Sequence, residues 1–196
     1  MSISIKSCYL DTNIILDYLR KRNEETLNFI NLAKEKRITV VTSHFAIFEV
    51  LDLEAQDKFI FKELKNKKAF DEIRRNLRNR NLTKKELENI YKKIRKNLFY
   101  IDIPLKLHYL SVNGWDYSLK FLMKTINLES KDVLHLASAI EARCDVLITK
   151  DEIFKQNAKE LIPAMTPKEF LKNLKELNIN PKSKSNIKNQ NAPKGL

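Results

Sequence analysis

The stretch SCYLDTN at residues 7–13 decides the fold: a short apolar run ends on an acid and two further polar residues. Its composition predicts a buried strand over residues 7–10, followed at once by Asp11. Open α/β sheets bind their ligands outside the carboxyl ends of their strands. Asp11 is therefore expected at the edge of a sheet, where a ligand would bind.

Three more acids stand beside strongly apolar segments. Glu49 lies within FAIFEVL, Asp132 opens DVLHLASA, and Asp151 follows VLITK. Each acid alone has a structural explanation, because acids cap helices and are favourable in a first helical turn. Glu49 fits this explanation least well, since apolar residues flank it inside a predicted helix. Together the four acids suggest a cation site, because unpaired carboxylates are costly to bury.

Apolar periodicity along the chain alternates between strand and helix patterns. This alternation predicts an α/β fold with a parallel sheet flanked by helices. The predicted strands cover residues 7–10, 38–42, 100–103 and 146–149. The predicted helices cover residues 13–19, 26–34, 43–54, 105–112, 117–125, a segment that begins near 132, and 168–177.

The bulk composition fits one domain. A chain of 196 residues with 43% hydrophobic residues can fill a single core, and we assign residues 1–179 to it. No apolar run approaches the ~20 residues that span a bilayer, so we expect a cytoplasmic protein without membrane association. The two cysteines, Cys8 and Cys144, are expected to be buried thiols rather than a disulfide.

Other chemistries find little support in the sequence. The chain has two glycines, Gly114 and Gly195, which excludes a glycine-rich loop for a nucleotide phosphate. No Gly-x-Ser-x-Gly motif marks a serine nucleophile. The three histidines have no metal-ligand spacing. His135, three residues after Asp132, could contact the acidic site, but we favour a hydrogen-bonded helix histidine.

The net charge of +12 is concentrated in two segments. Residues 62–97 carry fourteen basic and five acidic residues, a net charge of +9, and residues 172–196 carry +5, which leaves −2 for the remainder. RNA or DNA is the natural partner of such segments, and its binding should weaken with salt. A merely solvated surface is the alternative, especially for the tail. Residues 180–196 have no apolar periodicity and are expected to form a disordered basic tail.

The pattern of residues 62–97 predicts a basic helical hairpin inserted into the domain. Its two apolar stripes are expected on Phe70, Ile73 and Leu77, and on Leu87, Ile90, Tyr91, Ile94 and Leu98. Thr83 and Glu86 have the spacing of a capping box at the start of the second helix, and the turn is expected at 79–81. The candidate nucleic-acid-binding residues of this segment are Arg74, Arg75, Arg78 and Arg80.

Four short motifs follow one another along the chain: a strand ending in Asp11-Thr12-Asn13, a helix start from Ser43 to Glu49, the run Asp132-x-x-His-x-Ala-x-Ala, and Thr149-x-Asp151-x-x-Phe154. In order and context they resemble the PIN-domain nucleases, in particular the toxin ribonucleases of virulence-associated protein C (VapC) type. The resemblance implies a parallel-sheet fold and a metal site for Mg²⁺ or Mn²⁺ formed by Asp11, Glu49, Asp132 and Asp151. It also implies support of that site by Asn13 and Thr149, cleavage of single-stranded RNA, a cognate antitoxin and a homo-oligomer.

The sequence departs from the resembled family in two places. The basic segment 62–97 enlarges the chain beyond the usual compact toxin. Arg143-Cys144-Asp145 stands where the family commonly has a glycine before its last strand. We expect the second departure to affect only the exit from the preceding helix.

The acids suggest a chemistry independently of the resemblance. Mg²⁺ binds one or two carboxylates while it keeps water and phosphate-oxygen ligands, and such an ion activates water and stabilises charge on a leaving oxygen. Without a metal the acids should repel one another, so at least one pKa should rise. We therefore predict a metal-dependent endoribonuclease, with a toxin role favoured. The alternatives are an RNA-processing or quality-control nuclease without an antitoxin, and a non-catalytic nucleic-acid-binding or assembly module.

Overall fold

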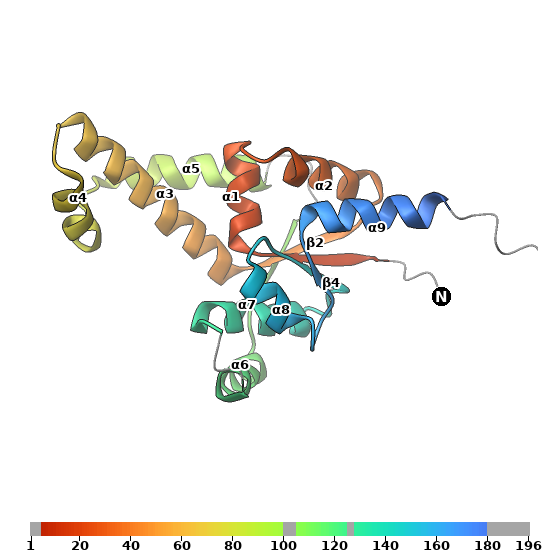
Figure 1. Cartoon of the computed structure of the whole chain (residues 1–196). Coiled ribbons are helices and arrows are strands. Elements are labelled where there is room, and N and C mark those ends of the chain that lie inside the picture. Colours follow the sequence, from red (N-terminus) through yellow and green to blue (C-terminus); the bar gives the residue numbers. More distant parts are fainter. Residues whose placement is uncertain (1–4, 100–104, 125–127, 180–196) are drawn as a thin grey trace, which may run out of the picture.

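The computed structural model describes residues 5–99, 105–124 and 128–179 of the chain (Figure 1). Its centre is a five-stranded parallel sheet in the order β3-β2-β1-β4-β5. The strands are β1 (Ser7–Leu10), β2 (Thr39–Ser43), β3 (Leu105–His108), β4 (Val146–Ile148) and β5 (Ala164–Met165). The predicted α/β class with a parallel sheet is confirmed.

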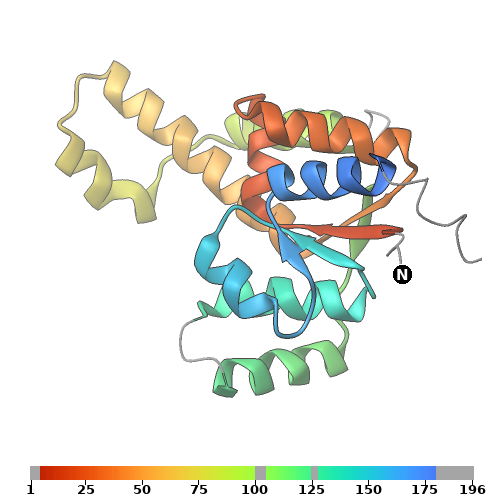
Figure 2. The same ribbon diagram turned by 45° about the vertical axis from the view of Figure 1, so that its right-hand side comes forward.

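Helices cover both faces of the sheet (Figure 2). They are α1 (Thr12–Arg20), α2 (Glu24–Glu35), α3 (His44–Lys65), α4 (Phe70–Asn76), the short 3₁₀ helix η1 (Leu77–Asn79), α5 (Lys84–Phe99), α6 (Val112–Lys124), α7 (Ser130–Glu141), α8 (Glu152–Ala158) and α9 (Pro167–Ile179). Helices α1, α2 and α9 lie on one face, and α7 and α8 lie on the other. Helix α6 packs against the outer side of α7.

Neighbouring residues of β1 belong to two separate cores. Cys8 and Leu10 are buried beneath α1, α2 and α9, where the rings of Phe29 and Phe170 meet edge to face. Tyr9 points to the opposite face, into the core beneath α7 and α8. Successive side chains of a strand alternate between faces, so a strand covered on both sides is apolar throughout. This explains the continuous apolar runs of β1 and β4.

Side chains at the strand ends begin the helices that follow. Asp11 caps α1, Ser43 caps α3 and Asp151 caps α8, each by accepting a hydrogen bond from a backbone N–H. Such caps satisfy free N–H groups of the first helical turn. After α7, where the resembled family commonly has a glycine, Arg143 adopts a left-handed φ of 54°. That conformation costs a non-glycine residue about 1–2 kcal/mol, so the departure is accommodated at the helix exit.

The prediction of a helix over residues 105–112 is wrong. Leu105–His108 forms β3, in parallel register with β2, and α6 begins only at Val112. The sequence LKLH alternates apolar and polar residues, which is a strand period, but four residues are too few to distinguish it from one helical turn. The strand predicted at 100–103 and the disordered tail predicted at 180–196 lie outside the described residues. The sequence also does not predict β5, whose two residues are too short to show any period.

Helices occupy the basic segment 62–97, but they pack differently from the predicted hairpin. Helix α3 continues to Lys65, α4 packs against α3, and α5 packs against α3 and α1. Ile90, Ile94 and Leu98 of α5 are buried in the same core as α1 and α2. The other members of the two predicted stripes differ in burial: Ile73 is buried, Leu77 is partly buried, and Phe70, Leu87 and Tyr91 are exposed.

The predicted capping box forms at the start of α5. The backbone N–H of Glu86 donates to Oγ1 of Thr83 at 3.2 Å, and the backbone N–H of Thr83 donates to Oε2 of Glu86 at 2.8 Å. This pair satisfies two backbone donors at the helix start. It therefore fixes where α5 begins after the irregular residues that follow η1.

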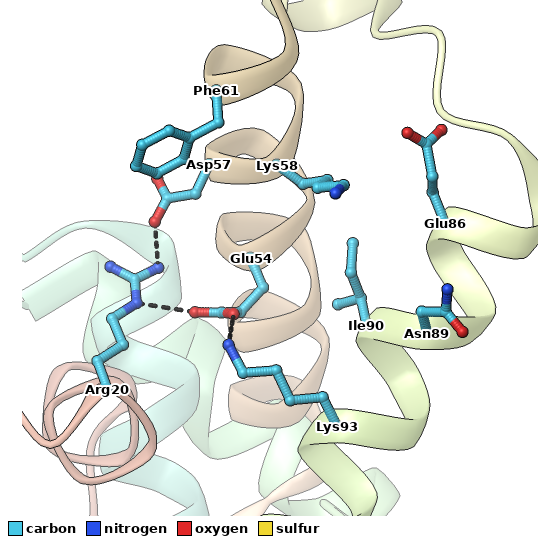
Figure 3. A pocket seen from close by; sticks show the side chains of 9 residues that line it. All are labelled: Arg20, Glu54, Asp57, Lys58, Phe61, Glu86, Asn89, Ile90 and Lys93. Atoms are coloured by element: carbon cyan, nitrogen blue, oxygen red, sulfur yellow. Dashed lines mark hydrogen bonds and ion pairs between the residues drawn. The ribbon is translucent and has the colours of Figure 1, made fainter. Parts of the chain in front are cut away.

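An ion-pair network fastens α5 to the rest of the domain (Figure 3). Glu54 of α3 accepts hydrogen bonds from Nε of Arg20 at 2.7 Å and from Nζ of Lys93 at 2.9 Å. Arg20 also pairs with Asp57 at 2.6 Å. These side chains line a pocket of about 450 Å³ between α1, α3 and α5. Burial raises the pKa of Glu54, but the Arg20 and Lys93 hydrogen bonds outweigh it and hold that pKa below its usual range.

We call residues 62–85, from the end of α3 to the start of α5, the basic arm. Its helix α4 lies at the end of α3 that is farthest from the sheet (Figure 1). Among the helices of the described segments, none combines the length and the apolar character needed to cross a bilayer. Both cysteines are free and buried, as predicted.

Truncation of a buried side chain of α5 should destabilise the whole domain. Ile94 is 2% exposed, whereas Tyr91 on the same helix is 51% exposed. We expect Ile94→Ala to lower the free energy of unfolding by about 2–4 kcal/mol, because it leaves a cavity. Tyr91→Ala should change it by less than about 1 kcal/mol. Denaturant unfolding measures both, and equally small effects would show that α5 is not part of the core.

Candidate active site

The four predicted acids line one pocket of about 240 Å³ at the carboxyl edge of the sheet. Asp11 follows β1 and Asp151 follows β4, and these strands are parallel neighbours. Glu49 lies on α3, and Asp132 lies in the first turn of α7. The remaining residues of the pocket are Thr12, Asn13, Leu16, Leu53, Lys131 and His135. The fold therefore brings all four acids to one place.

Asp11 is only 6% exposed and is surrounded by donors. Its Oδ1 accepts a hydrogen bond from the backbone N–H of Thr12 at 2.6 Å. Its Oδ2 accepts from Nδ2 of Asn13 at 2.7 Å and from Oγ1 of Thr149 at 2.6 Å. These donors offset the cost of burying the charge. Asn13 and Thr149, the two supporting residues that the resemblance implies, thus contact Asp11 directly.

Glu49 belongs to a buried chain of hydrogen bonds. Its Oε2 accepts from Oγ1 of Thr12 at 2.6 Å and lies 2.7 Å from Nε2 of His135. On the other side of the imidazole, Nδ1 lies 2.9 Å from the hydroxyl of Tyr9, which donates to Oγ of Ser43 at 2.9 Å. Burial raises the pKa of Glu49, but the hydrogen bonds from His135 and Thr12 lower it more, to below its usual range.

His135 is the site residue that sequence reasoning underrated. As expected it is a buried, hydrogen-bonded helix histidine, only 1% exposed, but it also lines the acidic pocket. The available signal is its spacing: three residues after Asp132 in a helix, it lies on the same face as that acid. The favoured interpretation, a hydrogen-bonded helix histidine, is confirmed, and the contact with the acidic site that the spacing also allows is present as well.

Asp132 shows the electrostatic crowding of the pocket. Burial, followed by the negative charges of Asp11 and Asp151, raises the pKa of Asp132 to about 6. The sequence predicts that at least one acid of this set has a raised pKa, and Asp132 is that acid. Every neighbouring charge that raises it comes from another acid of the pocket.

A second buried acid, Asp17, holds the loop that carries Asp151. Asp17 is fully buried on α1, and its Oδ2 accepts from Nζ of Lys150 at 2.7 Å, while its Oδ1 pairs with Arg22. Lys150 stands between Thr149 and Asp151, so this ion pair ties the β4–α8 turn to α1. Nothing in the sequence indicates the pairing, because the two residues are far apart along the chain.

Three of the four carboxylates of the pocket, those of Asp11, Glu49 and Asp151, accept hydrogen bonds from neighbouring groups. Oδ1 of Asp151 accepts from the backbone N–H of Phe154 at 2.9 Å, which caps α8. Within residues 5–99, 105–124 and 128–179, no three Asp, Glu, His or Cys side chains form a ready-made ligand set for a metal ion. The pocket gathers the acids, and sharing an ion would require some carboxylates to rotate.

The predicted nucleic-acid-binding arginines lie on the basic arm. Arg74, Arg75 and Arg78 are exposed on α4 and η1. Arg75 donates to the carbonyl oxygen of Asp71 in its own helix at 3.3 Å, whereas Arg80 pairs with Asp52 of α3. Three of the four side chains are therefore available to a ligand, and Arg80 mainly fixes the arm to α3.

Comparison with known proteins identifies the family. A model of the PIN domain matches residues 8–160, which is most of the chain. The chain belongs to the PIN-domain family. This is a family of nucleases, so hydrolysis of a phosphodiester bond is the chemistry to consider at the acidic pocket. All four acids lie within the matched residues of the PIN domain.

The PIN fold of this chain is similar to three solved structures of low sequence identity. The first is VapBC2 from Rickettsia felis bound to a DNA fragment from their promoter, at 17% identity and a TM-score of 0.53, over 82% of this chain and 98% of that chain. FitAcB from Neisseria gonorrhoeae is 16% identical, with a TM-score of 0.50 over 82% and 97% of the two chains. A toxin-antitoxin complex from Klebsiella pneumoniae is 15% identical, with a TM-score of 0.50 over 82% and 97%. No curated protein matches the chain.

The close approach of the acids predicts how the stability of the PIN domain depends on pH when a chelator removes divalent ions. Asp132 has a folded-state pKa of about 6 against an ordinary value of 3.8. The raised pKa means that protonated Asp132 stabilises the folded state. This contribution to the free energy of unfolding is complete below about pH 4 and is lost as the pH rises through about 6. Carbon-13 NMR titration of the carboxyl groups measures this pKa.

Asp151→Asn should lower the pKa of Asp132, because Asp151 is one of the charges that raise it. Glu160→Gln is the matched control, since Glu160 is exposed and lies outside the pocket. A pKa near 4 for Asp132 in the unmodified protein would contradict the crowded arrangement.

Proposed function

We propose that this PIN domain is a divalent-metal-dependent endoribonuclease that hydrolyses phosphodiester bonds of single-stranded RNA. The observation that carries the proposal is the gathering of Asp11, Glu49, Asp132 and Asp151 in one pocket at the carboxyl edge of the sheet. Ligands of open α/β sheets bind at this edge. We assign the catalytic and metal-binding roles to these four acids.

The pocket residues fit a hard cation such as Mg²⁺ or Mn²⁺. The acids supply oxygen ligands, which these ions prefer, and no thiol lines the pocket. The negative charges that raise the pKa of Asp132 are those that a bound cation would compensate. When bound, such an ion lowers the pKa of a water molecule and stabilises charge on the leaving oxygen.

The other residues of the pocket orient the acids. Asn13 and Thr149 hold Oδ2 of Asp11 from two different elements. Thr12 and His135 hold Oε2 of Glu49, so this carboxylate cannot turn freely. Residues that orient metal ligands in this way commonly affect metal affinity or activity by about 10–100-fold. Lys131, exposed on the rim, adds one positive charge beside the acids.

The distribution of charge supports a polyanionic substrate. The chain has a net charge of +12, but the acidic pocket by itself would repel a phosphate backbone. The exposed arginines of the basic arm supply attraction at another place. We assign RNA contact to Arg74, Arg75 and Arg78, with docking of a partner protein as the alternative role of the arm.

We further propose that the protein is the toxin of a toxin-antitoxin pair, that it acts in the cytoplasm, and that it forms a homo-oligomer. The fold shared with VapBC2 and with the Klebsiella pneumoniae toxin-antitoxin complex supports this role. A gene for a small antitoxin beside this one would favour it. Without such a gene, an RNA-processing or quality-control nuclease becomes the better interpretation.

Replacement of Asp11 tests the chemistry. Asp11→Asn removes one ligand charge at nearly constant volume, so we expect RNA cleavage with Mg²⁺ or Mn²⁺ to fall by more than about 100-fold. Glu160→Gln should cleave like the unmodified protein, because Glu160 lies outside the pocket. Cleavage of a mixed RNA pool, with and without chelator, is the measurement. Undiminished metal-dependent cleavage by a folded Asp11→Asn protein would rule out the assigned site. No cleavage by the unmodified protein would favour a non-catalytic binding module.

Charge reversal in the basic arm tests RNA binding there. We expect the triple change of Arg74, Arg75 and Arg78 to Glu to weaken RNA binding and to reduce its salt dependence by about one unit of slope for each phosphate that the arm no longer neutralises. Lys159→Glu is the single-residue control, because Lys159 is exposed and lies after α8, outside the arm. Binding isotherms at several salt concentrations provide the slopes. Unchanged affinity and slope would assign the arm to protein contacts instead.

A further inference from the structure

A second pocket, of about 290 Å³, lies beside the acidic one. Most of its wall is aromatic, with His44, Phe45 and Phe48 from the start of α3, Tyr109 from the residue after β3, and Trp115 from α6. We call it the aromatic pocket. The proposed chemistry at the four acids does not use these side chains.

The two pockets are neighbours along one edge of the sheet. The acidic pocket lies after β1 and β4, and the aromatic pocket contains Ser43 and His108, the last residues of β2 and β3. The strand order β3-β2-β1-β4 makes these four carboxyl ends a continuous row. A chain lying along this row would pass from one pocket directly into the other.

The pockets also share a wall. Phe45 lines the aromatic pocket and His135 lines the acidic pocket, and their ring centroids are 5.4 Å apart. On α3, two consecutive residues line different pockets: Phe48 lines the aromatic pocket and Glu49 lines the acidic pocket. One nucleotide can therefore occupy the aromatic pocket while an adjacent phosphate lies at the acids.

Three of the aromatic side chains, Phe48, Tyr109 and Trp115, are largely exposed to solvent. The rings of His44 and Tyr109 are stacked, with centroids 3.3 Å apart and an interplanar angle of 20°. Tyr109 remains 74% exposed although His44 lies against its ring, and Phe48 and Trp115 are 69% and 52% exposed. Exposed large apolar side chains clustered around one hollow are typical of a binding site. Stacked, accessible rings favour a planar ligand in particular.

The wall that carries Trp115 is held in place before any ligand binds. Glu141 of α7 accepts a hydrogen bond from the backbone N–H of Ser111 at 3.0 Å and lies 2.9 Å from Nε2 of His108. On α6, a Cβ on Gly114 would overlap Cδ1 of Leu110 and come within 2.8 Å of Oε2 of Glu141, so a larger residue there would have to displace both side chains. These contacts fix α6 against the end of β3. A preformed wall reduces the ordering cost of binding.

We propose that the aromatic pocket binds one unpaired nucleobase of the RNA strand whose backbone lies at the four acids. This inference rests on the proposed endoribonuclease function and names the subsite that selects the nucleotide beside the cleaved bond. Any base can stack on a flat aromatic side chain and gain affinity from it. Only an unpaired base can turn outward from its strand and enter such a pocket.

The polar groups of the pocket indicate what kind of selectivity it has. Oγ of Ser43 already accepts from Tyr9 and from the backbone N–H of Ala46, and Oγ of Ser138 donates to the carbonyl oxygen of Leu134. Both serine hydroxyls of the pocket already have partners within the protein, so we expect the pocket to bind the face of a base more than its edge. Stacking strength then sets the preference, and a purine, with its larger face, binds more tightly than a pyrimidine.

Trp115 provides a direct test, because it is the single tryptophan of the chain. The 196-residue chain is titrated in the presence of chelator with three RNA tetramers while Trp115 fluorescence is recorded. The tetramers are tetra-adenylate, tetra-uridylate and an abasic tetramer that has the same phosphates. We expect quenching by both base-containing tetramers, tighter binding of the adenylate, and no quenching by the abasic tetramer. Tyr109→Ala should weaken adenylate binding by about 5- to 150-fold, the effect of losing one stacked base.

Leu119→Ala is the matched control for that variant. Leu119 is 56% exposed on the same helix as Trp115 but does not line the pocket. Its substitution should leave adenylate affinity unchanged. Because Tyr109 and Leu119 are both exposed, neither change removes a core side chain, and thermal unfolding is expected to match that of the unmodified protein.

Mapping of cut sites separates this inference from the function on which it rests. In a mixed RNA pool with Mg²⁺ or Mn²⁺, Tyr109→Ala should flatten the base preference at one position beside the cut while cleavage persists. Base-dependent quenching without any cleavage would sustain the nucleobase site and overturn the nuclease function. Metal-dependent cleavage with equal quenching by the abasic and adenylate tetramers would overturn the nucleobase site alone. A change of oligomeric state in Tyr109→Ala, with quenching independent of bases, would also overturn it and would assign this surface to a second copy of the chain.

Discussion

The buried carboxylate of Asp11 is the constraint on which the arrangement of this domain depends. It lies between the end of β1 and the start of α1 with 6% of its surface exposed. A charge in that position is tolerated only when donors surround it. Those donors come from α1, through Thr12 and Asn13, and from the residue after β4, through Thr149. Burying this one acid therefore specifies how β1, α1 and β4 meet.

Glu49 is also held by hydrogen bonds that connect several elements of the fold. Its carboxylate is connected through His135 to Tyr9, in the middle of β1, and through Tyr9 to Ser43, which caps the helix that carries Glu49 itself. The chain of hydrogen bonds thus closes on α3. Buried polar networks specify a unique arrangement when they are fully satisfied and are costly when they are not. In this domain the network links both sides of the acidic pocket. Asp132 lies outside that network, and burial together with the charges of Asp11 and Asp151 raises its pKa.

The sequence predicts the features that depend on local pattern. The apolar runs of β1 and β4, the cap at Asp11 and the capping box of α5 need only neighbouring residues, and the structure contains them. The strand Leu105–His108 escapes prediction because its identity comes from pairing with β2, not from its four residues. Similarly, Ile94 of α5 packs into the core that contains α1, not against α4. The apolar stripe of α5 predicts that one face of the helix is buried, but it does not identify the element that covers this face. The pairing of Asp17 with Lys150 and the contact of His135 with Glu49 are tertiary, and periodicity contains no information about them.

Charge in this protein is divided between two regions with opposite requirements. The acids at the sheet edge repel a phosphate backbone unless a cation compensates them, whereas the basic arm attracts it without any cation. The ion pairs of Arg20 and Lys93 with Glu54 keep α5, and with it the arm, in a fixed place relative to the pocket. On the proposed function, affinity for RNA then resides mainly in the arm and in the aromatic pocket, and hydrolysis resides at the acids. The contribution of the arm is sensitive to salt, because it depends on counterion release. Hydrolysis at the acids is sensitive to divalent metal instead, because it depends on the cation charge that four carboxylates can hold.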